Sequence, residues 1–522
     1  MPASMTLFFS RTDYLLTLPM ILLTLFALAI LLMDCFLLEE PQSKWLNAVI
    51  GFAGILFAGG GVYKIQHELA VANLPSQAGL SGSMLVDHFS LYFWYLFLAG
   101  AAISILVSVR YLEIEHEHHG EFYSLMLFSV VGMMCMAAAM DIVLLFIGLE
   151  LMAISTYVLV GFLRSDRRSN EAALKYMLLG AFSSGIFAYG LSLLYGLSGS
   201  TNLGFIAQML SRRILMNQGQ VEPVAILAML ATMTGLLFKV AAIPFHQWAP
   251  DAYEGAPTSV TGFMSVAVKA AAWAMMLRVL LWGLPPLRSV WVPFLVFVSI
   301  ATMTGANLAA LTQDNLKRLL AYSSIAHVGY MLLGLVALGS VNFGSPGFFD
   351  GFKGILLYLL VYTFMNLGAF AVITSLRQRE VIGDTIDDIA GLYFRSPVEA
   401  VLMLVFLLSL AGIPPLAGFY GKYFIFLSLI ESGHYVLASL AVLYALFGLY
   451  YYMRIANAMF MRESTEPGKL PLSFGVRAAL AVTALGTVLI GIFPDPFIQI
   501  VNHATYWSLG FFQNPNTASL IR

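Results

Sequence analysis

Charge and cysteine are scarce in this chain. Of its 522 residues, only 10% are charged, whereas 60% are hydrophobic. A soluble domain carries about 25% charged residues, so this composition excludes a large water-soluble protein. Basic and acidic residues are nearly balanced, 26 against 28, which gives no indication of nucleic-acid binding. Cys35 and Cys135 stand alone and form no CxxC pattern, so we expect no iron–sulfur cluster and no metal site on this chain.

Apolar runs make up most of the remaining sequence. They are about 20 residues long or longer, the length that a helix needs to cross a bilayer. The short segments of alternating polarity that are typical of a membrane β-barrel do not occur. We therefore expect an all-α integral membrane protein with about 14 transmembrane helices. Their expected bounds are 14–38, 46–64, 88–109, 122–140, 142–163, 172–196, 222–245, 257–282, 290–311, 318–339, 352–376, 398–430, 434–460 and 477–500.

Two pairs of segments resemble each other within the chain. "MAISTYVLVG" (152–161) aligns with "IAHVGYMLLG" (325–334), which pairs Tyr157 with Tyr330, and "VAAIPF" (240–245) aligns with "LAGIPP" (410–415) at nearly the same offset. Each pair joins helices five apart, so we expect two inverted five-helix repeats in which helices 7 and 12 are broken at their prolines. Inverted repeats with broken helices are typical of transporters that bind ions near the bilayer midplane. The expected segments are 1–120 with helices 1–3, 121–285 with the first repeat, 286–461 with the second repeat, and 462–522 with helix 14 and a tail.

The basic residues predict how the chain is oriented in the membrane. Loops that follow odd-numbered helices hold more of them, as in "RSDRR" (164–168) and in the pair Lys317 and Arg318. By the positive-inside rule, these loops face the cytoplasm and both termini face outward.

Four ionisable residues lie inside apolar runs, where charge is expensive. They are Glu150 in helix 5, Lys239 in helix 7, Lys269 in helix 8 and Lys422 after the break of helix 12. A charged side chain at mid-span costs about 2.5–3.5 kcal/mol on insertion scales. A lysine can give up its proton, whereas an arginine keeps its charge. Pro244 frees backbone groups near Lys239, and freed backbone at membrane depth is tolerated where it lines a hydrated cavity or is buried in protein. We therefore expect these four residues to form a proton pathway.

Three further residues fit either a structural role or the pathway. Lys175 lies only a few residues into helix 6 and can extend to the membrane surface or join the pathway. His327 can be a hydrogen-bonded interior histidine or a relay beside Ser323 and Ser324. His246 follows the break of helix 7, and its position fits both roles.

Several motifs together resemble the antiporter-like subunits of respiratory complex I. They run from about residue 120 to 460 and are "GEFYSLMLFSVVGMM", "LLFIGLELMAIS", "SNEAALKYMLLGAFSSG", "FKVAAIPFHQWAPDAYEGAP", "DNLKRLLAYSSIAHVGYMLLG" and "LSLAGIPPLAGFYGKYF". Among those subunits, the chain is most similar to subunit N of bacterial NADH–quinone oxidoreductase. It lacks the long lateral C-terminal helix of subunit L, and Lys422 stands where subunit M typically carries a glutamate.

The resemblance implies a function and a set of partners. Glu150 and Lys239 would form an electrostatically coupled pair, and a proton would pass from Lys239 through Lys269 and His327 to Lys422 and then outward. FMN, iron–sulfur clusters and quinone are expected on partner subunits, with no cofactor on this chain. The expected partners are the neighbouring antiporter-like subunit M, small membrane subunits such as K and J, and the lipid bilayer of the bacterial plasma (inner) membrane, with no nucleic acid.

Other functions stay open on the residues alone. A subunit of a multisubunit cation/proton antiporter or of a membrane-bound hydrogenase would share the fold and the lysines. A stand-alone secondary transporter for an organic substrate would share the broken helices. In a membrane scaffold, the buried charges would only pair with one another.

Overall fold

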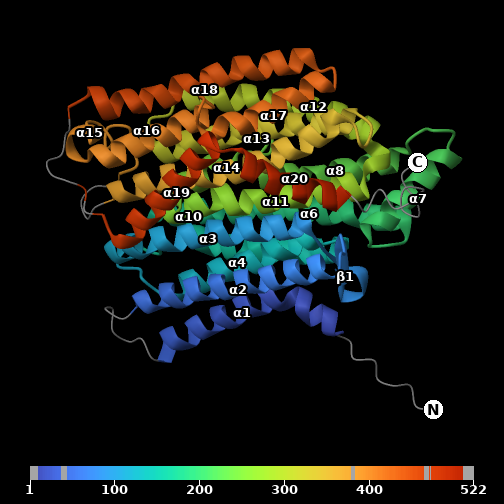
Figure 1. The fold of residues 1–522 in the computed structure, drawn as a ribbon, viewed down its shortest axis with the longest axis horizontal. Helices are drawn as coiled ribbons and strands as arrows, with labels where there is room; N and C mark the ends of the chain where they lie inside the picture. The colour runs from blue at the N-terminus through green and yellow to red at the C-terminus, as the bar shows by residue number, and fades with distance from the viewer. Residues whose placement is uncertain (1–9, 37–43, 378–382, 464–469, 471, 510–522) are drawn as a thin grey trace.

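The computed structural model describes residues 10–36, 44–377, 383–463, 470 and 472–509. Nearly parallel helices form a stack from α1 (Arg11–Phe36) at one edge to α18 (Tyr435–Met461) at the other (Figure 1). Within the described chain, 13 helices are long and apolar enough to cross a membrane. The broken pair α16 (Pro397–Ala411) and α17 (Ala417–Glu431) adds a further span. The predicted all-α membrane fold is confirmed.

The remaining helices follow the chain order of the expected spans. The first group is α2 (Trp45–Val71), α3 (His88–Glu115), α4 (Gly120–Ala138), α5 (Ile142–Val160), α6 (Arg167–Ser198), α7 (Leu203–Met216), α8 (Pro223–Val240) and α9 (Trp248–Gly255). The next span joins α10 (Thr258–Phe263) and α11 (Lys269–Arg278) with the π-helical turns η3 (Met264–Val268) and η4 (Val279–Gly283). The last group is α12 (Arg288–Leu311), α13 (Leu316–Ser340), α14 (Pro346–Leu376), α15 (Leu392–Arg395), α19 (Phe474–Ile492) and α20 (Asp495–Leu509).

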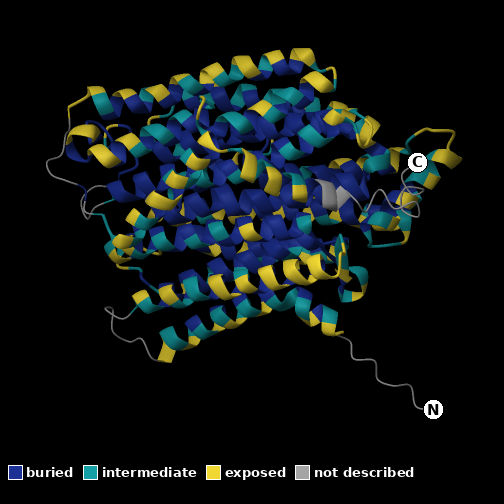
Figure 2. Cartoon of the chain, in the orientation of Figure 1, coloured by how far each residue is buried: buried dark blue, intermediate teal, exposed yellow. Residues whose placement is uncertain are grey.

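Three spans form the centre of the stack. In the most apolar stretch of each, 100% of the residues are buried in Thr258–Gly283, 94% in α13 and 89% in α14, against 39% in α1 and 33% in α18. Figure 2 shows the same gradient, because buried residues gather in the middle of the stack and exposed ones follow the outer helices. A polar group on the three central spans is therefore shielded from lipid.

Two expected helices end differently in the structure. The expected helix 222–245 ends at Val240, and the chain turns through residues 241–247 before it resumes as α9, which the sequence reading left in a loop. The expected helix 477–500 is wrong at its end, since α19 stops at Ile492 and α20 starts separately at Asp495. Pro494 and Pro496 explain this break, because proline cannot donate to a helical carbonyl. The rest of the expected tail, 510–522, lies outside the described residues.

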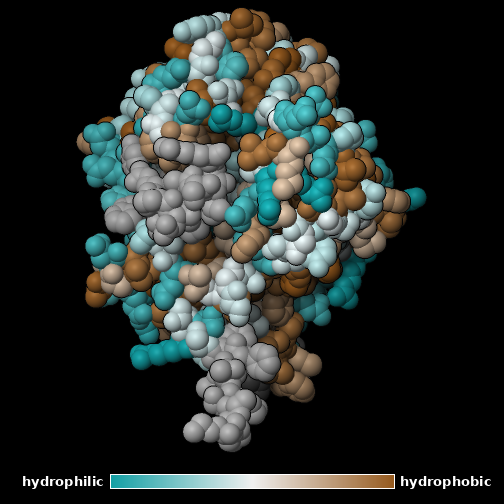
Figure 3. Space-filling model, turned by 90° about the vertical axis from the view of Figure 1, so that its right-hand side faces the viewer, coloured by the Kyte–Doolittle hydropathy of each residue, from teal (hydrophilic) through white to brown (hydrophobic). Residues whose placement is uncertain are grey.

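Two elements at one end of the stack have no counterpart in the sequence reading. A hairpin pairs β1 (Ser76–Gly79) with β2 (Met84–Asp87) through the turn η2 (Leu80–Gly82), and α7 projects beyond the spans (Figure 1). Figure 3 views the molecule from this end, where hydrophilic and apolar side chains are interspersed. Both elements are too short to appear as membrane spans. The boundaries of the four expected segments stay a prediction.

A fully buried ion pair joins the hairpin to the central spans. Arg278 at the end of α11 donates to the Asp87 carboxylate at 2.6 Å, and the two side chains are 0% and 1% exposed. Arg278 also donates to the carbonyl of Ala137 at 3.0 Å, while Asp87 caps α3 by accepting from the backbone of Ser90. One charge pair thus fixes the ends of α3, α4 and α11 relative to one another.

Replacing Arg278 with alanine leaves the Asp87 carboxylate buried without its partner. Removing one member of a buried ion pair costs about 3–5 kcal/mol, so we expect Arg278→Ala to lower the temperature at which the assembled membrane complex denatures, or to prevent its assembly. The matched control is Arg110→Ala, since Arg110 pairs with Glu113 at 3.3 Å with both side chains exposed. That pair is worth about 1 kcal/mol or less. Equal thermal denaturation of the two variant complexes would contradict the prediction.

Candidate functional site

The first break lies between α8 and α9 and is held by neighbouring side chains. Ala241 ends α8 in the left-handed backbone region, with φ +63°. The Trp248 indole donates to the carbonyl of Phe238 at 2.9 Å, and the backbone N–H of Ile243 donates to the hydroxyl of Thr302 on α12 at 3.0 Å. The break therefore has hydrogen-bond partners of its own, supplied by α9 and α12.

Lys239 lies in the last turn of α8 and is 3% exposed. Its ammonium group donates to the hydroxyl of Tyr157 on α5 at 3.3 Å and lies 5.5 Å from the centre of that ring. The sequence predicts freed carbonyls near Lys239, but one of them, the carbonyl of Phe238, accepts from the indole of Trp248. Aromatic and phenolic groups, and no carboxylate in direct contact, therefore stabilise the Lys239 charge.

Glu150 does not form an ion pair with Lys239 in the described structure. Its side chain is partly exposed on α5, and its Oε1 atom is buried without a hydrogen-bond partner. Glu150 and Tyr157 are seven residues apart, so they share one face of α5 at a separation of about 10 Å along the axis. The structure thus connects Lys239 to α5 through Tyr157, and the electrostatic coupling of Glu150 with Lys239 stays a prediction.

The second break lies between α16 and α17. There a lysine donates to the carbonyls at the end of the preceding helix, whereas a tryptophan does so at the first break. Gly412 follows α16 with φ +87°. Lys422 on α17 reaches back and donates to the carbonyls of Leu410 at 3.1 Å and Ala411 at 2.7 Å. A helix leaves its last carbonyls unpaired and carries partial negative charge at that end, so it stabilises a cation there. The buried Lys422 charge is matched to the end of a helix.

The two tyrosines that align in the repeat occupy equivalent places. Tyr157 contacts Lys239 beside the first break, and the ring of Tyr330 on α13 lies 5.2 Å from the ammonium of Lys422 beside the second. The lysines come from opposite halves of their broken helices, since Lys239 precedes its break and Lys422 follows its own. In both repeats, a tyrosine therefore contacts a lysine beside the break. The lysine lies before the break in the first repeat and after it in the second.

Lys269 lies in the centre of the molecule at the start of α11. The π-helical turn η3 immediately precedes it, and turns of this kind are frequent at functional sites. Its ammonium donates to the hydroxyl of Ser324 on α13 and lies 3.4 Å from the carbonyl of the same residue. The ring centre of Tyr253 on α9 is 5.9 Å away. Neutral polar groups and an aromatic ring stabilise Lys269, as they do Lys239.

His327 follows Ser324 by one helical turn on α13. Its Nδ1 atom hydrogen-bonds the hydroxyl of Tyr358 on α14 at 2.5 Å, and its Nε2 atom hydrogen-bonds the hydroxyl of Tyr452 on α18 at 3.0 Å. Ser324, His327 and Tyr330 are spaced by three residues and so follow one face of α13. This face leads from Lys269 to the ring beside Lys422.

A stack of aromatic rings leads from Lys239 to Lys269. The ring centres of Tyr157 and Tyr176 are 4.6 Å apart, those of Tyr176 and Trp248 are 4.4 Å apart, and those of Trp248 and Tyr253 are 6.3 Å apart. The hydroxyls of Tyr176 and Tyr253 are buried beside the hydroxyls of Thr156 and Ser324, respectively, but neither forms a well-aligned hydrogen bond in the described part of the chain. Buried polar atoms of this kind are bonded by internal water in most proteins.

The structure places Lys175 outside this line. Its ammonium pairs with Glu171 at 2.9 Å and Asp251 at 3.1 Å, and its side chain is 46% exposed. Arg318 pairs with the same Asp251 at 2.8 Å, so Lys175 belongs to an ion network near the surface.

His246 lies in the turn between α8 and α9, where its Nδ1 atom is buried and forms no hydrogen bond in the described structure.

Three tyrosines contact Lys269 or His327 in the structure but did not stand out in the sequence. Tyr253, Tyr358 and Tyr452 lie on α9, α14 and α18, and each meets a lysine or histidine of α11 or α13. Their only sequence signal is a phenol in or beside an apolar helix, which is also the signal of a membrane-interface belt. The three-dimensional packing separates the two roles.

Comparisons with known proteins identify the family of the chain. The chain matches the family described as "NADH:quinone oxidoreductase/Mrp antiporter, TM" over residues 139–448. It is 60% identical over 516 residues to "NADH-quinone oxidoreductase subunit N 1" of Koribacter versatilis, covering 98% of each chain. It is 51% identical over 504 residues to "NADH-quinone oxidoreductase subunit N 2" of Solibacter usitatus, covering 96% of this chain and 99% of the relative.

A solved structure extends the agreement to the fold. A chain of respiratory complex I from Thermus thermophilus with bound aureothin is 32% identical, with a TM-score of 0.76, and the match covers 92% of this chain and 98% of that chain. The chain therefore belongs to the NADH:quinone oxidoreductase/Mrp antiporter family of membrane proteins, among which it is similar to the subunits N of NADH-quinone oxidoreductase.

Proposed function

We propose that this chain is a proton-translocating membrane subunit of an NADH–quinone oxidoreductase and that Lys239, Lys269 and Lys422 carry the proton. The observation that carries the proposal is that these three lysines are 3%, 3% and 7% exposed and, in the described structure, make their polar contacts with neutral groups. The buried Arg278, in contrast, pairs directly with Asp87. A scaffold would be expected to pair its buried charges in the same way.

The contacts define what each group does in the transfer. Lys239, held by the Tyr157 hydroxyl, gives up its proton toward the aromatic stack and Lys269. Lys269 delivers it to the face of α13, where His327 bonds a phenol at each ring nitrogen and so can accept a proton at one nitrogen while releasing one at the other. Lys422 on α17, which donates to the last carbonyl of α16, is the last group of the proton pathway and releases the proton outward. Glu150 tunes Lys239 through charge.

The energy source and the redox groups belong to other subunits in this proposal. FMN, the iron–sulfur clusters and quinone are placed on partner subunits, and this chain contributes no redox centre. The relatives at 60% and 51% identity are named subunits of NADH-quinone oxidoreductase, which favours this function over a cation/proton antiporter of the same family.

The lateral surface near Glu150 supports membrane partners. Glu150 is partly exposed on α5 between the exposed side chains of Ile147 and Ile154. The two isoleucines form an apolar surface, and a carboxylate is costly to leave beside hydrocarbon, so we infer that another membrane subunit covers this face. Subunit M and small subunits such as K and J are the proposed neighbours, in the bacterial plasma membrane.

Lys239→Ala tests the proposed function directly. The substitution removes the amine that exchanges the proton, so we expect proton pumping by the assembled complex to fall about tenfold or more in membrane vesicles supplied with NADH. The matched control is Lys64→Ala, because Lys64 is an exposed lysine on α2. Full pumping by an assembled Lys239→Ala complex would refute the role of this lysine.

Gly412→Ala tests whether Lys422 must stay on the end of α16. A Cβ atom at Gly412 would lie 2.8 Å from Cδ of Lys422 and would push the side chain off the carbonyls. Gly433→Ala is the control, since it has a similar φ of +79° but no neighbouring atom within 4 Å. Both alanines strain the backbone by about 1–2 kcal/mol. We expect similar thermal stability for both complexes and loss of proton pumping in Gly412→Ala alone, and equal pumping in the two variants would contradict the prediction.

A further inference from the structure

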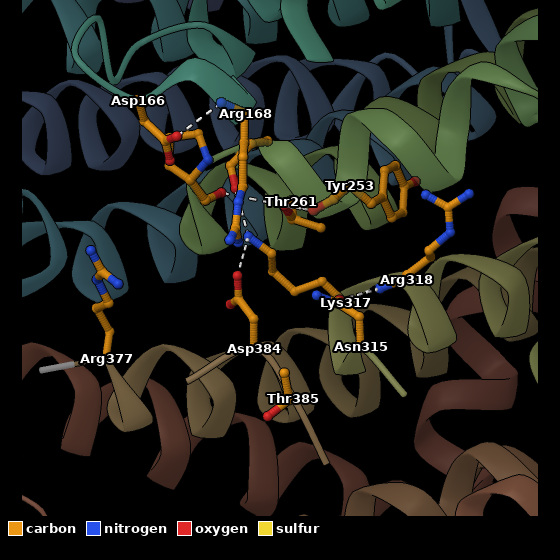
Figure 4. Close-up of polar contacts among 12 residues, drawn as sticks. Asp166, Arg168, Tyr253, Thr261, Asn315, Lys317, Arg318, Arg377, Asp384 and Thr385 are labelled. Carbon is orange, nitrogen blue, oxygen red and sulfur yellow. Dashed lines mark hydrogen bonds and ion pairs between the residues drawn. The ribbon is translucent and has the colours of Figure 1, made fainter. Parts of the chain in front are cut away.

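A polar cavity opens at the end of the stack opposite to the hairpin. Its volume is about 220 Å³, and it lies where the ends of α3, α5, α9 and α14 meet the start of α13. These are the ends whose loops carry the excess of basic residues, so the cavity faces the cytoplasm in the expected orientation. Figure 4 shows charged side chains from several of these elements that converge on Lys317 and Asp384.

Lys317 and Asp384 form a shielded ion pair in this cavity. Their charged atoms are 3.3 Å apart, and the side chains are 4% and 10% exposed. Lys317 also donates to the carbonyl of Ala256 at 3.0 Å. The backbone sets this contact, because Leu316 N–H donates to the Asp384 carbonyl at 2.6 Å and Thr385 pairs with Asn315 in an isolated bridge. Asp384 is therefore fixed against the first turn of α13 by main-chain bonds.

Other charges surround the pair and are largely balanced. Arg377 binds Glu115 through two hydrogen bonds of 2.5 and 3.1 Å. The remaining titratable groups that face the cavity are Tyr111, Asp166, Arg168 and Glu254. Burial raises the pKa of Asp384 above its ordinary value, and the charge of Lys317 opposes this shift most strongly. Asp384 is thus easier to protonate than an exposed aspartate.

Lys317 lies on the same face of α13 as Ser324, the residue that contacts Lys269. Lys317 and Ser324 are seven residues apart and share one helical face, at a separation of about 10 Å along the axis. Ser324 accepts from Lys269. Tyr253, whose ring also lies beside Lys269, is 1% exposed, and its hydroxyl neighbours Ser324 without a well-aligned hydrogen bond in the described structure. Tyr253 lies in the last turn of α9, three residues before the cavity wall at Ala256. Tyr253 is therefore beside the central lysine in space and directly precedes the cavity-lining residues Glu254, Gly255 and Ala256 along the chain.

We propose that Asp384 loads protons from the cytoplasmic cavity onto Lys269, as an input separate from Lys239, with Lys317 as its positioning residue and Tyr253 as the connecting hydroxyl. The proposal rests on the proposed proton-carrying role of Lys269. A proton from cavity water binds the Asp384 carboxylate, which becomes neutral. Tyr253 then gives its hydroxyl proton to the neutral amine of Lys269 and takes the proton from Asp384, through internal water where the groups are not in contact. Asp384 returns to its charged form beside Lys317, and no electron is transferred.

The test compares three variants in the assembled complex across a pH series. Asp384→Asn keeps an oxygen that can accept from Lys317 but cannot carry a proton, whereas Asp384→Glu keeps the carboxyl group. We expect Asp384→Asn to pump about tenfold more slowly at about pH 8 and to recover toward about pH 6, where protons are more abundant, while Asp384→Glu retains most of the rate. Asp387→Asn is the control, because Asp387 lies in the same loop and pairs with Arg462 with its side chain 82% exposed.

The outcomes separate this inference from the proposed function. A shifted pH profile in Asp384→Asn, with normal assembly and an unchanged Asp387→Asn profile, supports the loading role. A uniform loss at every pH, or equal defects in the asparagine and glutamate variants, shows that the ion pair is only structural and overturns the inference. Unaltered pumping by Asp384→Asn while Lys239→Ala abolishes pumping also overturns the inference and leaves the proposed function standing. Full pumping by both variants overturns the two together.

Discussion

An ammonium group buried at membrane depth needs solvation, and the described residues provide it for the three central lysines without a contacting carboxylate. Lys239 has a phenol, Lys269 has a serine and an aromatic ring, and Lys422 has two carbonyls at a helix end. A contacting carboxylate would stabilise the charged amine and hold its proton in place. Neutral donors and acceptors stabilise the charge less, so the proton can leave. Most of the architecture around the site can be understood from this requirement.

The broken helices are the structural means of meeting it. At the second break, the chain exposes the last carbonyls of α16, and Lys422 uses them directly. At the first break, Trp248 and Thr302 hydrogen-bond the freed backbone groups, so Lys239 hydrogen-bonds Tyr157 on α5 instead. The two repeats thus share a break and a tyrosine but solvate their lysines differently. This difference is consistent with distinct roles at the two ends of one pathway, the first accepting and the second releasing.

The fold could be predicted largely from hydropathy, because each span is an apolar run of membrane length. The intramembrane Lys239, Lys269 and Lys422 could also be found in this way, because a charged residue inside an apolar run is visible from the sequence alone. The sequence could not show that Trp248 caps the first break, that Tyr452 reaches His327 from 125 residues away, or that Glu150 makes no direct contact with Lys239. These contacts depend on helix rotation and tertiary packing. The short helix α9 was missed because "WAPDAYEG" is polar and contains proline, although tertiary contacts make it helical.

Internal water determines whether the separate groups act as one pathway. Within the described residues, the phenols of Tyr176 and Tyr253 form no well-aligned hydrogen bond, and a hydrogen-bonded chain between Lys239 and Lys269 requires water at these atoms. The most direct measurement is a density map of the assembled complex at a resolution that shows ordered water. The account predicts water molecules bonded to both phenols and a continuous polar connection from Lys239 through Lys269 and His327 to Lys422. A dry, closely packed region between these lysines would contradict it.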